Sequence, residues 1–109
     1  MKLNDTPRQR PQAMAGFRAG LFVGYALHTA EGWICVIAVG MGWSKSIHRT
    51  ADDARTCLRS TAHAADFDWF TSIEQLEQRL QTLPESSMPS IMPEMLNANL
   101  GRWQRLSLN

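Results

Sequence analysis

The chain has 109 residues, of which 44% are hydrophobic, and its formal net charge is +1. This length accommodates one domain with a modest core, and this apolar content excludes a chain that is disordered throughout. A net charge so near zero neither requires nor excludes a nucleic-acid partner.

Charge is unevenly distributed along the chain. Residues 1–49 contain six basic and two acidic residues, a net charge of +4, and residues 50–98 contain three basic and eight acidic residues, a net charge of −5. Arg102 and Arg105 add +2 near the C-terminus. A chain with this distribution can associate head to tail or present either sign of charge to a partner.

The first 14 residues are polar and include two prolines, which predicts a flexible N-terminal arm over residues 1–14. They contain no continuous apolar stretch of the kind that a secretory signal requires. The two cysteines, Cys35 and Cys57, fall in apolar patterns, so we expect reduced core residues and no disulfide framework. Together these features favour a cytoplasmic protein.

Two apolar runs, residues 21–27 and 33–39, flank a short polar break. Both are strand-sized and apolar at successive positions, which predicts a β-hairpin of two central strands covered on both faces. Glu31 and Gly32 are expected in a three-residue loop with a bulge, because glycine adopts positive φ without a clash. The larger side chains lie at odd positions in both runs, so this face is expected to meet the helices.

The same stretch is long enough to cross a bilayer as a helix. However, His28, Thr29 and Glu31 lie near its middle, and an acid at mid-bilayer costs about 2.5–3.5 kcal/mol. We therefore expect no transmembrane segment and no membrane partner.

A third strand and a first helix are expected next. Residues 43–49 alternate, with Trp43 and Ile47 on one side and polar residues on the other, as a half-exposed strand does. Residues 50–62 predict a helix with a thin apolar stripe, capped by the hydroxyl of Thr50.

A fourth strand and a second helix follow. Residues 63–70 alternate between apolar and polar side chains. Thr71 and Glu74 fit a capping box, and the apolar stripe after it predicts an amphipathic helix that Pro84 ends.

The sequence therefore predicts an α+β fold: a small, mostly antiparallel sheet with its helices mainly on one face. We expect a single domain over residues 15–84 and a C-terminal appendage over residues 85–109. The appendage is expected to contain a loop, a short helix over residues 93–100 and, at the end, an extra strand or a docking arm.

For function, the pattern favours a small non-enzymatic interaction or regulatory module that binds a partner protein or forms a homodimer. The expected partner-binding patch consists of apolar residues of the appendage, which suit an adaptable contact surface: Met92, Met95, Leu100 and Trp103. The alternative is that the methionines close this chain's own core, because small domains need every apolar group they can bury.

A second hypothesis is nucleic-acid binding by the basic N-terminal half, through cations beside an aromatic side chain. The candidate residues are Arg8, Arg10, Arg18, Trp43, Lys45 and Arg49. The alternative for these residues is an ordinary sheet edge with a solvated rim and a frayed N-terminus.

A third hypothesis is a small metal-dependent enzyme centred on Asp66 and Asp68, which share a strand face. The alternative is an edge strand that uses charge to resist aggregation. The histidines and cysteines show no C-x-x-C or H-x-x-x-H spacing, so we expect no zinc site, no catalytic residues and no cofactor.

Overall fold

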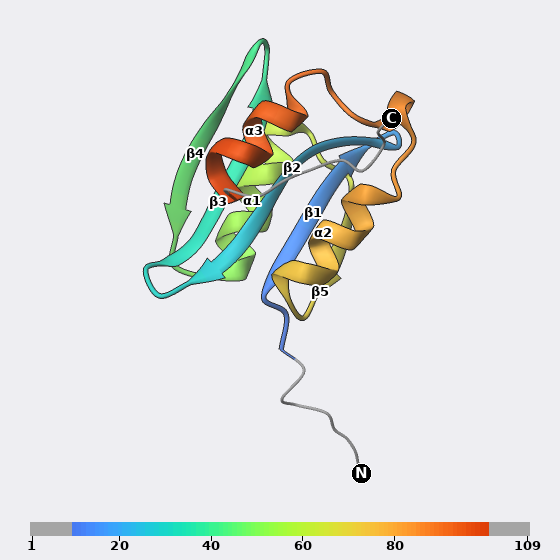
Figure 1. The fold of residues 1–109 in the computed structure, drawn as a ribbon. Coiled ribbons are helices and arrows are strands. Elements are labelled where there is room, and N and C mark those ends of the chain that lie inside the picture. The colour runs from blue at the N-terminus through green and yellow to red at the C-terminus, as the bar shows by residue number, and fades with distance from the viewer. Residues whose placement is uncertain (1–9, 101–109) are drawn as a thin grey trace.

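The computed structural model describes residues 10–100, except for the side chain of Leu100 (Figure 1). Five antiparallel strands form one open sheet in the order β4-β3-β2-β1-β5. The strands are β1 (Ala13–Arg18), β2 (Leu21–Thr29), β3 (Gly32–Val39), β4 (Gly42–His48) and β5 (Asp66–Phe70). The helices are α1 (Ala51–Ala62), α2 (Ile73–Gln81), a 3-10 turn η1 (Glu85–Ser87) and α3 (Met92–Leu100). The predicted α+β class with an antiparallel sheet is confirmed.

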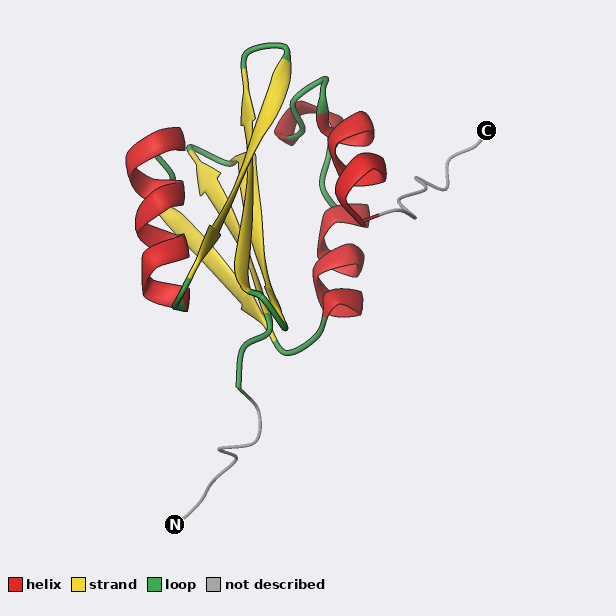
Figure 2. Cartoon of the chain, turned by 90° about the vertical axis from the view of Figure 1, so that its left-hand side faces the viewer, coloured by secondary structure: helices red, strands yellow, loops and turns green. Residues whose placement is uncertain are grey.

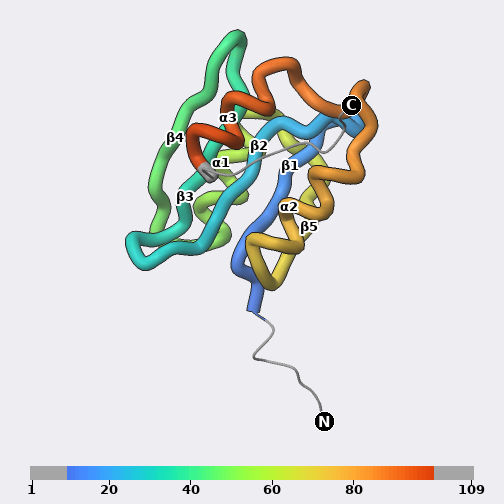
Figure 3. The backbone as a smooth tube through the Cα atoms, in the orientation of Figure 1, coloured from blue at the N-terminus to red at the C-terminus, as the bar shows by residue number. Residues whose placement is uncertain are grey.

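The first four strands form a meander, as the backbone trace in Figure 3 shows. Each of its three hairpin loops has two residues. Ala19 and Gly20 both have positive φ, as the tight turn between β1 and β2 requires. Between β2 and β3 the loop is also two residues long, because Thr29 pairs with Gly32. The expected three-residue loop is therefore one residue too long, although Gly32 does adopt a positive φ of 130°.

A β-bulge in β2 changes which side chains share a face. Gly16 pairs with Gly24 and Phe17 with Phe22, so Val23 is an extra residue with no partner in β1. Beyond the bulge, Tyr25 lies on the same face as Phe22, and Val23 lies on the other. The prediction that the odd positions of residues 21–27 form one face is wrong for this reason.

Helices cover both faces of the sheet, with α1 alone on one side and α2 and α3 on the other (Figure 2). The α1 side is centred on Ala54 and Leu58, which pack on the odd side chains of β3 such as Cys35 and Ile37. The opposite side contains the larger core cluster, which includes Phe17, Phe22, Tyr25, Leu27, Val36, Leu76, Leu80, Met92, Met95 and Leu96. The sequence predicts that the odd-numbered side chains of both hairpin strands pack against the helices. On the side of α2 and α3, however, β3 contributes its even-numbered side chains.

Side-chain hydrogen bonds and backbone conformation determine where the helices begin and end. Thr50 caps α1 as predicted, since its side chain accepts a hydrogen bond from the backbone N–H of Asp53 at 3.1 Å. The cap of α2 is Ser72, which accepts from the N–H of Gln75 at 3.2 Å, so the capping box expected at Thr71 is displaced by one residue. His63 ends α1 with a φ of 59°, so β5 begins at Asp66, three residues later than expected.

Strand β1 is the element that the sequence analysis does not predict. Ala13 and Met14, expected in the flexible arm, are its first two residues, and both are fully buried. Within residues 10–100, no helix is long and apolar enough to cross a membrane.

Candidate functional site

The two edges of the sheet differ in length and in charge. Within residues 10–100, β4 pairs only with β3, over seven regular residue pairs without a bulge or a proline. In the same part of the chain, β5 pairs only with β1, over five residues, and exposes Asp66 and half-exposes Asp68. An edge strand presents unpaired N–H and C=O groups, and charged side chains make such an edge less able to pair with another chain.

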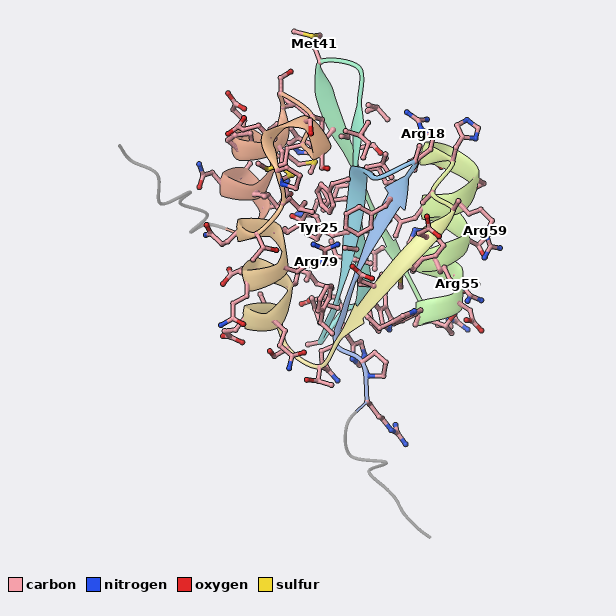
Figure 4. All side chains as sticks on the ribbon, turned by 90° about the vertical axis from the view of Figure 1, so that its right-hand side faces the viewer. Arg18, Tyr25, Met41, Arg55, Arg59 and Arg79 are labelled. Carbon is pink, nitrogen blue, oxygen red and sulfur yellow. The ribbon has the colours of Figure 1, made fainter. Side chains whose placement is uncertain are left out.

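The β4 edge exposes apolar surface. Ile47 is 58% exposed, and Lys45 is the one lysine, arginine or acidic residue of β4. On the same face, half-buried Ile34 and Trp43 pack at the margin of the larger core. The hairpin tip that leads into β4 carries Met41, which is 89% exposed and projects from the top of the sheet (Figure 4).

At the opposite edge, Asp68 is held by an ion pair. Arg79 on α2 donates from Nε to Asp68 Oδ2 at 3.0 Å, and its guanidinium lies 5.4 Å from the ring centroid of Phe17. Within residues 10–100, no third metal ligand joins Asp66 and Asp68. These contacts support a structural role for Asp68, which ties α2 to β5.

The structure places two of the four residues of the predicted partner-binding patch, Met92 and Met95. Met92 and Met95 are fully buried in the larger core, so they close this chain's own interior, which is the alternative stated for them. Trp103 and the side chain of Leu100 lie outside the described part of the chain.

The basic residues of the nucleic-acid hypothesis lie on separate parts of the molecule. Arg18 ends β1 and reaches the C-terminus of α1, where Nη1 lies 3.5 Å from the carbonyl oxygen of Ala62. Lys45 and Trp43 lie on β4, which two intervening strands, β3 and β2, separate from β1 in the sheet.

The remaining basic candidates for nucleic-acid binding are Arg8, Arg10 and Arg49. Arg10 is exposed and lines a shallow pocket of about 230 Å³ with His28 and Trp33. Arg49 is exposed just beyond β4, and Arg8 lies outside the described residues. Among the candidates that the structure places, Arg18 and Lys45 thus share no common groove.

On the α1 side of β4, the structure brings together three side chains that bind metals in many proteins. Cys35 comes from β3, His48 from β4 and Cys57 from α1, and one ligand atom from each lies within 4.8 Å of the other two. His28 and His63 are not members of this cluster.

The cluster places polar side chains within the apolar layer between α1 and the sheet. The hydroxyl of Ser46 lies 2.8 Å from His48 Nε2 and 3.8 Å from Cys57 Sγ, and Cys35 Sγ lies 3.9 Å from the carbonyl oxygen of Ala54. Cys35 is fully buried, whereas Cys57 and His48 are only partly buried. Burial raises the pKa of the Cys35 thiol well above its usual value, and the neighbouring Cys57 raises it further.

Sequence reasoning missed this cluster because its members are far apart in the chain. The signal that could have found it is strand register: the two-residue turn after β3 places Cys35 opposite Ser46. Side chains two apart on a strand share a face, so His48 then lies on the same side as Cys35.

Over residues 10–100, the fold and these features define a small α+β protein with an open five-stranded sheet between helices, β4 at one edge and a thiol–imidazole cluster beneath that strand. Comparison of the chain with protein-family models, with curated proteins and with solved structures finds no match.

Proposed function

We propose that this chain is a non-enzymatic protein-interaction module whose partner is a second copy of itself, joined by antiparallel pairing of the two β4 strands. The observation that carries the proposal is that β4, with its exposed Ile47, has no second strand neighbour within residues 10–100. Pairing would extend the sheet across both copies and satisfy the outward backbone groups of both edges.

The contrast between the two edges supports β4 as the pairing strand. β5 is shorter, and its two aspartates oppose edge-to-edge association. β4 has seven residues in regular register and a single lysine, so a second strand can align along its whole length.

The side chains of β4 favour one register. A two-fold axis through Ser46 places Lys45 opposite Ile47 of the other copy, where the aliphatic stem of the lysine covers the isoleucine. An axis through Lys45 would place two lysines directly opposite each other, which is unfavourable. We therefore expect the axis at Ser46.

The cytoplasm is the proposed compartment. Cys35 and Cys57 are both free thiols, and free thiols persist where the environment is reducing.

Charge substitutions at Ile47 test both the pairing and its register. Ile47→Lys places like charges opposite each other twice in the symmetric pair, whereas Ile47→Glu places an acid opposite Lys45 of the other copy. We expect Ile47→Lys to weaken the dimer by about tenfold or more, a change of about 1.4 kcal/mol, and Ile47→Glu to weaken it less. The measurement is the concentration dependence of molar mass by light scattering or sedimentation.

Matched controls distinguish a specific effect on β4 pairing from a general effect of added surface charge. Met41→Lys adds the same charge at an exposed position beyond the paired stretch and should leave the dimer intact. The double variant Lys45→Glu/Ile47→Lys restores opposite charges and should recover association. A wild-type chain that stays monomeric at all concentrations contradicts the proposal, and capture of a foreign extended peptide along β4 would replace the second copy as partner.

A further inference from the structure

The thiol–imidazole cluster lies where three elements meet, and its geometry is close to that of a metal site. In a tetrahedral zinc site, bonds of about 2.3 Å to sulfur and about 2.0–2.1 Å to nitrogen place neighbouring ligand atoms about 3.5–3.8 Å apart. The ligand atoms of Cys35, His48 and Cys57 all lie within 4.8 Å of one another. A contraction of about 1.3 Å or less, within the reach of side-chain rotation, would bring them to these spacings.

The donor set selects a class of ion. Two thiolates and one imidazole are soft and borderline ligands, which prefer Zn²⁺ or Cu⁺ to hard ions such as Mg²⁺ or Ca²⁺. Two thiolate charges also balance one divalent cation, so a buried thiolate at Cys35 would be compensated by the ion.

The position of Ser46 also supports a metal site. Its hydroxyl lies 2.8 Å from His48 Nε2 and 3.8 Å from Cys57 Sγ, so it is directed into the same small space. Ser46 is opposite Cys35 in the sheet, which places a fourth polar group beside the three ligands. The hydroxyl can occupy the fourth position of a tetrahedral ion or hold a water molecule there.

The burial of the three ligands differs. Cys35 is fully buried, while Cys57 on α1 and His48 at the end of β4 are partly exposed, so solvent reaches two of the three ligands. An ion held there would connect α1 to both strands of the β3–β4 hairpin.

We propose that Cys35, His48 and Cys57 form a binding site for a thiophilic metal ion, with Zn²⁺ as the expected occupant and Ser46 beside the fourth coordination position. The site departs from the sequence-based expectation of no metal, because three elements rather than a local motif assemble it. It does not depend on pairing through β4.

The test is zinc binding by the full chain, reduced with a non-thiol reductant and titrated against a chromophoric zinc chelator. We expect about one Zn²⁺ per chain, and Mg²⁺ should not compete. Cys57→Ser and His48→Ala should each lower the zinc affinity by about 100-fold, since each removes one ligand of a three-residue set. Both residues are partly exposed, so the variants should fold, and their circular dichroism with a chelator present should match the wild-type spectrum.

The matched control is His63→Asn, which removes an imidazole outside the cluster at a position where asparagine tolerates the positive φ. It should retain wild-type affinity, and so should the Ile47→Lys variant, in which pairing through β4 is expected to be weaker. Co²⁺ gives a second readout, because thiolate ligation produces a charge-transfer absorption that Cys57→Ser should reduce. The proposal is overturned if the wild-type chain binds no stoichiometric zinc, or if Cys57→Ser and His48→Ala bind zinc as tightly as the wild type.

Discussion

Tyr25 is a buried polar residue at the centre of the fold. Its side chain is fully buried in the larger core, and its ring stacks on Phe22 with centroids 6.4 Å apart. Figure 4 places it between the sheet and the α2 side of the molecule. Within residues 10–100, its hydroxyl has no hydrogen-bond partner. A buried hydroxyl without a partner costs stability, because it gives up its hydrogen bonds to water.

The Tyr25→Phe variant should therefore be as stable as the wild type or more stable, by up to about 1 kcal/mol. The substitution keeps the ring and removes only the unpartnered oxygen. Urea denaturation at neutral pH measures the free energy of unfolding. A loss of more than about 1 kcal/mol would mean that the hydroxyl makes a favourable interaction after all.

Tyr25 also predicts the response of the protein to alkali. Burial raises the pKa of its phenol above the usual value of about 10, so the folded state keeps the proton that the unfolded state releases. Below about pH 10 the phenol is neutral in both states, so the free energy of unfolding does not depend on its ionisation. Above about pH 10 the unfolded state releases the proton, and the free energy of unfolding falls progressively as the pH rises. The buried Cys35 thiol, whose pKa is also raised, begins the same loss near pH 9.

Because the chain has one tyrosine, tyrosinate absorbance reports Tyr25 alone. We expect this absorbance to appear only together with the loss of circular dichroism, and above pH 10. Ionisation near pH 10 in a chain that is still folded would show that water reaches the phenol.

At the scale of elements, the hairpin and the helices could be predicted because their signals are local. The apolar runs of β2 and β3 and the apolar stripe of α2 are each long enough to show their periodicity in the sequence. Thr50 is a residue type that commonly caps helices. β1 could not be predicted, because residues 13–16 read Ala-Met-Ala-Gly, which has no alternation and little β-propensity.

The small residues of β1 and β2 are explained by packing that only the three-dimensional structure shows. A Cβ built on Gly16 would lie 3.1 Å from the Cβ of Ala64, which is tighter than ordinary contact. The bulge at Val23 and the assembly of Cys35, His48 and Cys57 likewise depend on strand register, for which the sequence carries no local signal.

Gly24 gives the sharpest test of this close packing. A Cβ there would lie 2.7 Å from the backbone oxygen of Val36 and 2.8 Å from a methyl group of Leu58. Gly24→Ala should therefore destabilise the fold by about 1–3 kcal/mol, because the sheet and α1 must separate to admit the methyl group.

The matched control is Gly42→Ala on β4, where a Cβ would meet no atom within 4 Å among the described residues and φ is not positive. This variant should change the free energy of unfolding by less than about 0.5 kcal/mol. Thermal or urea unfolding of both variants measures the difference, and equal effects at the two glycines would contradict the packing described for α1.

Over residues 10–100, the molecule is a sheet shielded on both faces, with β4 and β5 as its two edges. α1 covers one side and α2 with α3 the other, so the strand faces are largely satisfied within the chain. The β5 edge carries its own charges, whereas the outward backbone of β4 has no strand partner among the described residues. The proposed dimer pairs β4 with β4 of a second copy.

Amide hydrogen exchange resolved along β4, at protein concentrations below and above the dissociation constant of the dimer, is the sharpest test of this pairing. Alternate amides of Gly42–His48 point away from β3, and they should become slower to exchange as the concentration rises, while β5 amides on the outer side stay unchanged. Pairing through β4 is ruled out if the outward β4 amides exchange at one rate over the whole concentration range, or if protection grows at β5 instead.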